Sequence, residues 1–431
     1  MPNVNDMLSV DLLESIMDAL LLDNDIAWFA RARQNAKDTC QLWSFIISHS
    51  PRYWRKLYIG RPTKAEFILW QLGRAPHGPL QVQIYGCRGT DTVTEDIEEM
   101  ASKLERCLVP VFPRVETLEM ETTHIVDWIT LAAVIGPCET YFLRSLTFTI
   151  GTANPMRIDW TQPTRRPTLP QTKWMNVQRL TGKGIIPVSG QWNAHANLTK
   201  LELTTFKSAG IGDVLAMLRG TKHLHELILD DVLFYTSIPS FDFQRARLTH
   251  LKRLRFKCWA NLDWSVLGHI EAPSLDVLCL HVLGRSFAHV ARTCTHLLGS
   301  VRQLDLLLWA TDEEATNKIW GALDQVKTID ISQSGLDTWD SLHAYMDRNE
   351  HCWAGLEEIR LRRYLTKEEA TSILRHHAAR RDLRVVARVE GGSDEEKRWG
   401  GNGITVFTSL DDATNTTTRA HEYLWDEAQF R

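Results

Sequence analysis

Two Cys-x-His pairs in the second half of the chain have the residue types that zinc prefers as ligands. Cys279 and His281 form one pair, and Cys294 and His296 form the other. Thiolates and imidazoles are the usual ligands of protein zinc sites. Cys294, however, falls on the apolar stripe of an expected helix, whereas Cys279 and His281 share the opposite face of an expected strand. A layer of core should separate the two pairs, so we expect neither a metal site nor a bound cofactor.

The chain carries no motif typical of hydrolases or nucleotide-binding enzymes. The His-Glu pair at 225–226 is followed by Leu229 where a zinc-protease motif needs its second histidine. The Gly-Lys-Gly stretch at 182–184 lacks the third glycine of a dinucleotide-binding loop. Because no acid, base and nucleophile occur together in a known arrangement, we expect a protein that is not an enzyme.

The composition is that of a globular chain rather than of a nucleic-acid-binding or membrane protein. The 431 residues are 44% hydrophobic and 24% charged, with a formal net charge of -4. A basic run at 252–257 is isolated, which argues against nucleic-acid binding. The longest apolar stretches, such as 129–135, are too short to span a membrane. No secretory signal is visible and the eight cysteines are scattered, so we expect reduced thiols and a cytoplasmic or nuclear location.

One pattern, apolar-x-x-apolar-x-apolar, recurs along most of the chain. From Leu201 onward its middle residues are 24 to 30 residues apart, and its last two apolar positions alternate as in a half-buried strand. A damaged copy should lie at Leu180 and a weaker tenth copy at Val386, and 80–84 could form an opening strand. The nine clear copies have the middle residues Leu118, Leu146, Leu201, Leu227, Leu254, Leu278, Leu304, Ile329 and Ile359.

Segments of helical periodicity lie between the expected strands. Apolar stripes predict helices near 214–218, 287–298, 315–323 and 370–374. A unit of strand, turn, helix and turn at this period is a leucine-rich repeat, which buries its apolar face only by stacking on its neighbours. The predicted fold class is therefore α/β, a leucine-rich-repeat solenoid with irregular repeats of about 24–30 residues.

The first fifty residues differ from the repeats. Leu12, Leu13 and Ile16 belong to one face of an amphipathic helix expected over 8–20, which Ser9 or Asp11 could cap. A second helix is expected over 26–33 and a third over 36–47, before Ser50-Pro51. Three short helices bury little surface, so a partner or the following repeats should complete their core.

This N-terminal segment resembles an F-box, a small three-helix domain. The family pattern begins Leu-Pro-x-Glu-Leu-Leu-x-x-Ile-Phe and continues to a Cys-Arg-x-Trp third helix. Ser9 replaces the pattern's proline, Asp11 its glutamate and Gln41 its basic residue. With the repeats behind it, the chain is similar to fungal F-box proteins that continue into leucine-rich repeats. The matching residues are Leu8, Leu12, Leu13, Ile16, Met17, Cys40, Trp43 and the SPRYWRKLYI stretch at 50–59.

The resemblance implies a substrate-recognition subunit of an SCF-type ubiquitin ligase. The F-box would dock onto a Skp-type adaptor, which connects it to a cullin, while the repeats would bind a protein substrate for degradation. Two alternatives stay open. The helices could serve only as a cap for the first repeat, or the chain could be an interaction scaffold not coupled to ubiquitination, which the changes at Ser9 and Asp11 favour. The residues implied in or beneath the adaptor interface are Leu8, Leu12, Leu13, Ile16 and Trp43.

In such repeats the positions between and after the last two strand leucines face the concave, solvent-exposed side. Charged residues at these positions are our candidates for contacts with a protein substrate. Any exposed strand shows a mixed-charge face, however, so these residues mark a surface without identifying its partner. The candidates are Arg253, Arg255, Lys257, His281, Asp305, Arg360 and Arg362.

The expected domain organisation follows from these patterns. A helical F-box-like domain should cover 1–60, a linker 61–79 and the solenoid 80–410. A Pro-rich insertion at 152–172 should replace a repeat, and 411–431 should form a C-terminal tail.

Overall fold

The computed structural model of the chain forms two compact units. One unit comprises Met1–Leu224 with Val232–Pro239, and the other comprises His225–Asp231 with Ser240–Arg431. The residues that the structure describes are 9–21, 26–86, 93–123, 125–150, 176–184, 197–204, 207–209, 211–230, 233–234, 244–258, 265–282, 287–308, 313–331, 336–349, 352–365, 384–389 and 404–406.

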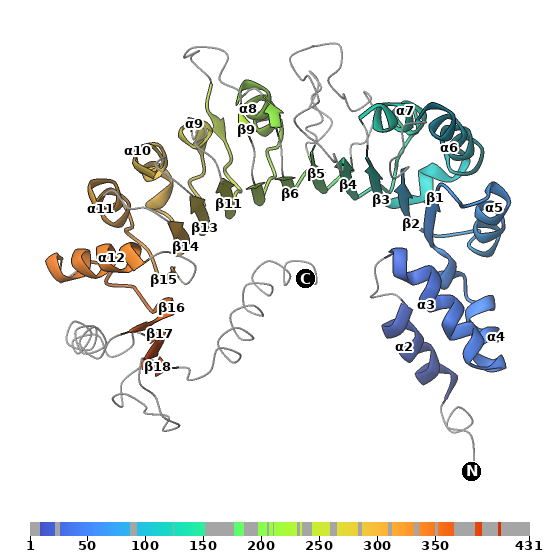
Figure 1. Ribbon diagram of the computed structural model, residues 1–431, viewed down its shortest axis with the longest axis horizontal. Helices are drawn as coiled ribbons and strands as arrows, with labels where there is room; N and C mark the ends of the chain where they lie inside the picture. The colour runs from blue at the N-terminus through green and yellow to red at the C-terminus, as the bar shows by residue number, and fades with distance from the viewer. Residues whose placement is uncertain are drawn as a thin grey trace. The chain divides into compact units, whose positions relative to one another are not determined.

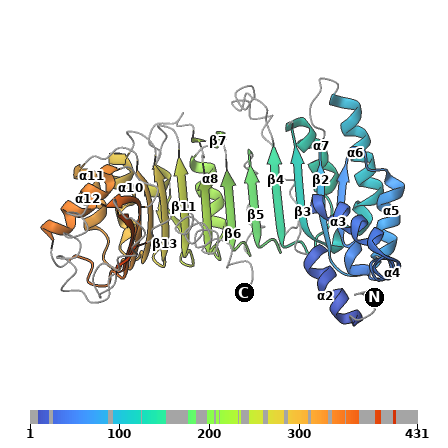
Figure 2. The same ribbon diagram turned by 60° about the horizontal axis from the view of Figure 1, so that its bottom comes forward.

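The first unit is built on a parallel sheet in which each strand pairs with the next one along the chain. The strands share one direction (Figure 2), and α5 to α7 lie along one side of them (Figure 1). The strands are β1 (Lys56–Gly60), β2 (Leu80–Tyr85), β3 (Val115–Thr122), β4 (Ser145–Ile150), β5 (Arg179–Lys183) and β6 (Lys200–Thr204). The helices after β1 are α5 (Ala65–Arg74), α6 (Val93–Cys107), α7 (Ile125–Ile135) and α8 (Ile211–Gly220), with a 3-10 turn η2 (Val109–Arg114) and a small sheet of β7 (Lys207–Ala209) and β9 (Leu233–Phe234).

The second unit repeats this arrangement. Its parallel strands also follow chain order, and helices α10 and α11 lie along one side of them (Figure 1). The strands are β8 (Glu226–Asp230), β11 (Arg253–Cys258), β13 (Val277–Val282), β14 (Gln303–Leu308), β15 (Thr328–Asp330), β16 (Glu358–Leu365), β17 (Arg384–Val389) and β18 (Ile404–Val406). The helices are α9 (Ser265–Gly268), α10 (Phe287–Leu298), α11 (Glu313–Gly321) and α12 (Leu336–Arg348), and β10 (Ala246–Arg247) pairs with β12 (Ile270–Glu271).

The strand register confirms the apolar repeat. In the second unit, the predicted middle residues from Leu227 to Ile359 lie opposite one another from strand to strand. The damaged copy is also confirmed, because Leu180 lies between Leu146 and Leu201 in the first unit. The tenth copy was placed wrongly by one residue: Val385, not Val386, lies opposite Ile359.

The repeat residues form the core of each unit. Leu146, Leu201, Leu254 and Leu278 are fully buried, as the alternating pattern requires. The expected helical stripes pack over them: Val214, Leu215 and Leu218 on α8, Ala291, Cys294 and Leu298 on α10, and Ala315, Ile319 and Trp320 on α11 are all buried. Burial of apolar side chains from the strands and helices therefore holds each repeat against the next one.

The N-terminal helices differ in detail from the prediction. They are α2 (Val10–Leu21), α3 (Ile26–Thr39) and α4 (Gln41–His49), followed by a 3-10 turn η1 (Pro51–Trp54). Ala36, expected in the third helix, belongs to α3, because the helix breaks at Cys40, whose backbone is extended. The expected linker over 61–79 contains α5, and β1 at the end of the expected helical domain pairs with β2.

Several predicted features fall outside the described residues. They are Leu8, the Pro-rich insertion at 152–172, the helix near 370–374 and the tail at 411–431. The backbone of Arg362 belongs to β16, but its side chain lies outside the described set.

Candidate functional site

Helix α2 presents two different faces to its surroundings. Ser9 caps it, because the Ser9 hydroxyl accepts a hydrogen bond from the Leu12 backbone N–H at 3.2 Å. Leu13 and Met17 are fully buried on the inner face. Leu12 and Leu20 lie on the outer side, each 47% exposed. Of the residues predicted at an adaptor interface, Leu12 is thus accessible, whereas Leu13 lies beneath the surface.

Other apolar side chains of the N-terminal helices are also partly or largely accessible. Ile16 and Trp43 are half-buried, and Phe45 on α4 is 61% exposed. Phe45 was not among the predicted interface residues. The buried positions of α4 are the neighbouring Ile46 and Ile47. Because Phe45 is the most exposed large apolar side chain of the described N-terminal helices, we include α4 in the candidate surface.

Charged groups attach α2 to the turn η1. The Arg52 guanidinium pairs with Glu14 at 2.8 Å and with Asp18 at 3.0 Å. The Tyr53 hydroxyl donates a hydrogen bond to Asp18 at 2.8 Å. Burial, supported by this hydrogen bond, raises the pKa of Tyr53 to about 12, so the phenol keeps its proton. These contacts fix the orientation of the outer face of α2.

Trp54 joins the N-terminal helices to the first strands. Its indole N–H donates to the Ile47 carbonyl at 2.8 Å, and the Arg33 guanidinium lies 4.0 Å from the ring centroid. Arg33 also donates to the Tyr53 carbonyl at 3.0 Å, and burial lowers the pKa of Arg33 to about 10. Helix α3, which carries Arg33, packs on β1 and β2. The helices therefore form one core with the beginning of the sheet.

Helix α5 carries two further exposed aromatic side chains. Phe67 and Trp70 are 46% and 44% exposed, and their rings stack with centroids 5.6 Å apart. Trp70 also meets Trp54 edge-on at 4.9 Å. Because Trp54 belongs to the helical core, the α5 aromatics are continuous with it. Phe67 and Trp70 were not predicted as surface residues, since this segment was expected to be a linker.

A second candidate surface is the sheet face of the second unit that points away from the apolar core. We call it the non-core face. Two rows of residues cross it, as the strand register places them side by side. The first row is Ile228, Arg255, Cys279, Asp305, Asp330 and Arg360, and the second is Asp230, Lys257, His281 and Leu307.

The expectation that this face is open to solvent was wrong for its centre. Ile228, Cys279, His281, Leu307 and Asp330 are buried. Neighbouring parallel strands hold equivalent side chains only about 4.8 Å apart, so side chains in one row shield one another from water. Three predicted contact residues, Arg253, Arg255 and Lys257, are half-buried, as are Asp305 and Arg360.

Two basic residues of the non-core face, Arg255 and Arg360, are engaged with acidic neighbours. Arg255 pairs with Asp230 at 2.6 Å across strands β8 and β11. Arg360 pairs with Glu358 on its own strand and lies 4.0 Å from Asp330. Among the predicted contact residues, the charges of Arg255 and Arg360 are thus balanced by acidic neighbours.

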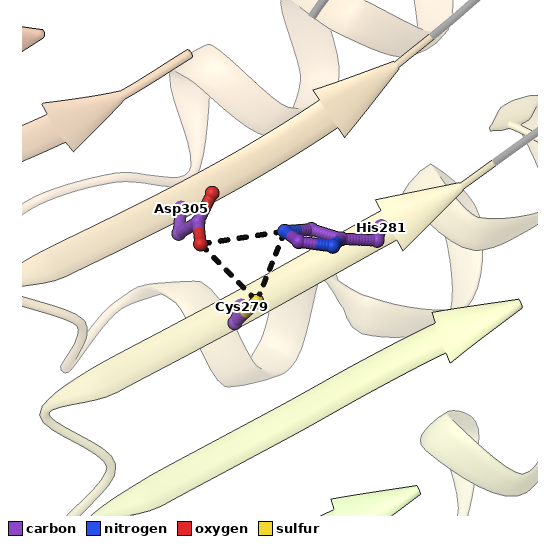
Figure 3. Close-up of side chains that lie close together, drawn as sticks. All are labelled: Cys279, His281 and Asp305. Atoms are coloured by element: carbon purple, nitrogen blue, oxygen red, sulfur yellow. Dashed lines mark hydrogen bonds and ion pairs between the residues drawn. The ribbon is translucent and has the colours of Figure 1, made fainter. Parts of the chain in front are cut away.

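At the centre of this face, Cys279, His281 and Asp305 converge on one point (Figure 3). Cys279 Sγ lies 3.2 Å from His281 Nε2 and 3.3 Å from Asp305 Oδ2, and the last two atoms are 3.3 Å apart. Cys279 and His281 share a face because they are two residues apart on β13. Asp305 joins them because it lies opposite Cys279 on β14. We call these three residues the Cys-His-Asp cluster.

The cluster does not have the geometry of a cysteine nucleophile with its base. A catalytic relay uses both ring nitrogens of the histidine, one toward the nucleophile and one toward the acid. Here the thiol and the carboxylate both contact Nε2. Burial, followed by the Asp305 carboxylate, also raises the pKa of Cys279 well above its usual range, which disfavours the thiolate.

The two predicted Cys-x-His pairs are not joined into one site. Cys294 is buried on α10, and His296 Nε2 lies 2.8 Å from the Ile270 carbonyl oxygen. Asp305 was predicted as a contact residue but not as the neighbour of Cys279 and His281. A signal for it was present, because Asp305 and Cys279 occupy the same position of successive repeats and so should lie side by side.

Among the described residues, no helix is both long and apolar enough to cross a membrane. The described cysteines 40, 107, 138, 279, 294 and 352 are free thiols.

No protein-family model matches the chain, and no curated protein sequence matches it. Among solved structures, it is similar to TLR13 in a TLR13–ssRNA13 complex, with a TM-score of 0.32 and 11% identity over 66% of this chain and 47% of that chain. The chain thus spans about half the length of that structure. It is also similar to a structure of the Rad7 and Elc1 complex in yeast, with a TM-score of 0.31 and 11% identity over 94% of this chain and 99% of that chain. Likenesses this distant decide neither the fold family nor the function.

Proposed function

We propose that the chain is a leucine-rich-repeat protein that acts as the substrate-recognition subunit of an SCF-type ubiquitin ligase. In this proposal the N-terminal helices are an F-box that docks onto a Skp-type adaptor, and the non-core face of the repeats binds the protein substrate. The F-box-like sequence pattern and the repeats motivate the two parts. One observation carries the proposal, namely that α2 and α4 expose large apolar side chains beside a well-packed core.

The exposed residues are of the kind that an adaptor interface requires. Leu12, Leu20 and Phe45 are each about half or more exposed. Because each side chain is already about half buried, covering the rest would yield about half of the roughly 1.5–3 kcal/mol that full burial of an exposed apolar side chain contributes. The salt bridges of Arg52 and the Ser9 cap hold α2 in place without a partner. The adaptor would therefore meet a preformed surface, which lowers the entropic cost of binding.

The structure also offers an observation for the competing role as a cap of the sheet. Helix α3 packs on β1 and β2, and Trp54 donates a hydrogen bond into α4. The helical segment thus stabilises the first strands whether or not it binds an adaptor. Deleting the segment would uncover these strands, so a deletion cannot separate the two roles.

Surface substitutions can separate them. We expect Leu12→Glu combined with Phe45→Glu in the full chain to abolish binding to a purified Skp-type adaptor in a calorimetric or pull-down assay, while circular dichroism and thermal melting stay unchanged. Ile129→Glu on α7 is the matched control, since Ile129 is 42% exposed and lies outside the N-terminal helices. Equal adaptor binding by the double variant, or no binding by the native chain, would leave the cap or scaffold role as the better account.

A further inference from the structure

The three donor atoms of the Cys-His-Asp cluster form a nearly equilateral triangle with edges of 3.2, 3.3 and 3.3 Å. In tetrahedral zinc sites, bond lengths of about 2.3 Å to sulfur and about 2.0–2.1 Å to nitrogen and oxygen place neighbouring ligand atoms about 3.3–3.6 Å apart. The triangle therefore has nearly the size of one face of a zinc coordination tetrahedron. We propose that Cys279, His281 and Asp305 bind a divalent transition metal, of which Zn²⁺ fits best.

The charge of the cluster suits such an ion. A cysteine thiolate and the Asp305 carboxylate together carry two negative charges, and His281 adds a neutral imidazole. A bound Zn²⁺ would make the cluster electrically neutral, which matters because Cys279 and His281 are buried and a net charge there would be costly. The opposite charges of Arg255 and Asp230 on the neighbouring strands cancel each other, so this ion pair does not change the net charge around the cluster.

The choice of metal follows from the ligand types. Mg²⁺ and Ca²⁺ prefer oxygen ligands and higher coordination numbers, which a thiolate and an imidazole do not provide. Sulfur, nitrogen and oxygen ligands in one site are typical of Zn²⁺ and related ions. Metal binding would displace the thiol proton, because the ion stabilises the thiolate far more than the surrounding protein does.

Three protein ligands leave one corner of the tetrahedron open. In zinc sites of this kind a water molecule or a ligand from outside fills the fourth position. The Asp305 side chain is 15% exposed and that of His281 8%, so the open corner would lie at the edge of the buried layer. Metal binding by these residues does not depend on the proposed ubiquitin-ligase function.

The competing explanation is a metal-free hydrogen-bonded cluster. In that state the Cys279 thiol donates to Asp305 Oδ2, and a proton on His281 Nε2 would point to the same oxygen atom. In both states each buried polar group has a partner, either a hydrogen bond or the metal. The test must therefore detect the metal–sulfur bond itself. Co²⁺ serves as the probe, because tetrahedral Co²⁺ bound to a thiolate gives visible d–d bands and a thiolate-to-cobalt charge-transfer band.

The experiment titrates the chelator-treated full chain with Co²⁺ and then with Zn²⁺. We expect the charge-transfer band to saturate at about one Co²⁺ per chain and to disappear when Zn²⁺ displaces the cobalt. Cys279→Ser should remove the band. His281→Gln and Asp305→Asn, which keep the side-chain size, should weaken Co²⁺ binding by more than about tenfold.

Two variants serve as controls. Asp330→Asn changes the acidic residue opposite Asp305 in the same row, and Cys138→Ser changes a half-buried thiol in the other unit. Both should bind Co²⁺ as the native chain does. Circular dichroism and thermal melting check that each variant folds; if Cys279→Ser does not fold, the Asp305→Asn result decides. A native chain without the band, a band that survives in Cys279→Ser, or equal losses in the controls would overturn the proposal and leave adventitious binding only.

Discussion

Cys279 and Asp305 lie directly opposite each other on strands β13 and β14, and the Cys279 thiol donates a hydrogen bond to Asp305 Oδ2 over 3.3 Å. Desolvation by burial, followed by this carboxylate, raises the pKa of Cys279 well above its usual range. The thiolate is the form that reacts with alkylating reagents. Burial and the neighbouring carboxylate should therefore both slow the alkylation of this thiol in the metal-free chain.

Alkylation of the metal-free native chain should therefore discriminate between its cysteines. We expect Cys279 and Cys294, both buried, to react much more slowly with iodoacetamide near pH 8 than the half-buried Cys40. Mass spectrometry of peptides after short pulses would measure the order. Labelling of Cys279 as fast as Cys40 would mean that the Cys-His-Asp cluster opens readily, contrary to its packing.

The Arg255–Asp230 ion pair should make a measurable contribution to stability. The two side chains are 28% and 14% exposed and their charged atoms are 2.6 Å apart, so the pair lies between the exposed and buried extremes. A double-mutant cycle with Arg255→Met and Asp230→Asn should give a coupling free energy of about 1–3 kcal/mol. Chemical unfolding of the four proteins measures it.

A more exposed pair provides the comparison. Lys327 and Glu357 form an ion pair with side chains 48% and 61% exposed. The same cycle with Lys327→Met and Glu357→Gln should give less than about 1 kcal/mol, because water screens this pair. Equal coupling in the two cycles would contradict the role of burial on the non-core face.

Cys294 should make the stability of the second unit depend on alkaline pH. Burial raises the pKa of Cys294 to about 12 from a value of 9.0 in the unfolded chain. The unfolded chain therefore loses this proton first, and stability that is complete below pH 9.0 is lost as the pH rises toward about 12. The slope from this group is at most about 1.4 kcal/mol per pH unit.

Urea unfolding over this pH range would test the slope. Cys294→Ala should be less stable than the native chain at neutral pH because it leaves a cavity, but its stability should fall less steeply above pH 9.0. Parallel curves for the two proteins would show that Cys294 does not stay protonated in the native state.

The parallel sheet was predictable because its signal is local and repeated. Each repeat carries apolar residues at the same positions, so spacing alone aligns Leu254 with Leu278 and Leu304. The tenth copy was misplaced because Val385 and Val386 are adjacent apolar residues, and repeats of variable length do not decide which of them lies opposite Ile359. Further along, the pairing of β16 with β17 shifts by two residues between Arg360 and Tyr364, an irregularity that leaves no mark on the apolar pattern.

The candidate sites were predictable only in part, because they depend on contacts between distant segments. Cys279 and His281 attracted attention as neighbours in the sequence, but Asp305 reaches them only through the strand register. Leu13 and Leu12 looked equivalent on the helical stripe, yet one is fully buried and the other 47% exposed. Which side of the stripe is covered depends on η1 and α3, which contact α2, and a helical periodicity does not encode these contacts.

Trp353 has an unusual backbone conformation, with a φ of 51°. Its side chain explains why the conformation is retained. The indole donates a hydrogen bond to the Trp320 carbonyl at 3.2 Å, and the ring stacks on Tyr345 with centroids 5.3 Å apart. The favourable packing of a tryptophan that is only 5% exposed thus offsets backbone strain of about 1–3 kcal/mol.

This balance predicts that glycine is tolerated better than alanine at position 353, the reverse of their usual order in a helix. Trp353→Ala loses the packing and keeps the strain, so it should destabilise the second unit by about 3–5 kcal/mol. Trp353→Gly loses the same packing but accepts a positive φ without strain, so it should be more stable than the alanine variant by about 1 kcal/mol. Trp320 in helix α11 is the matched control, because there glycine should be about 1 kcal/mol worse than alanine. Chemical unfolding of the four variants measures both differences, and the same order at the two positions would contradict strain at Trp353.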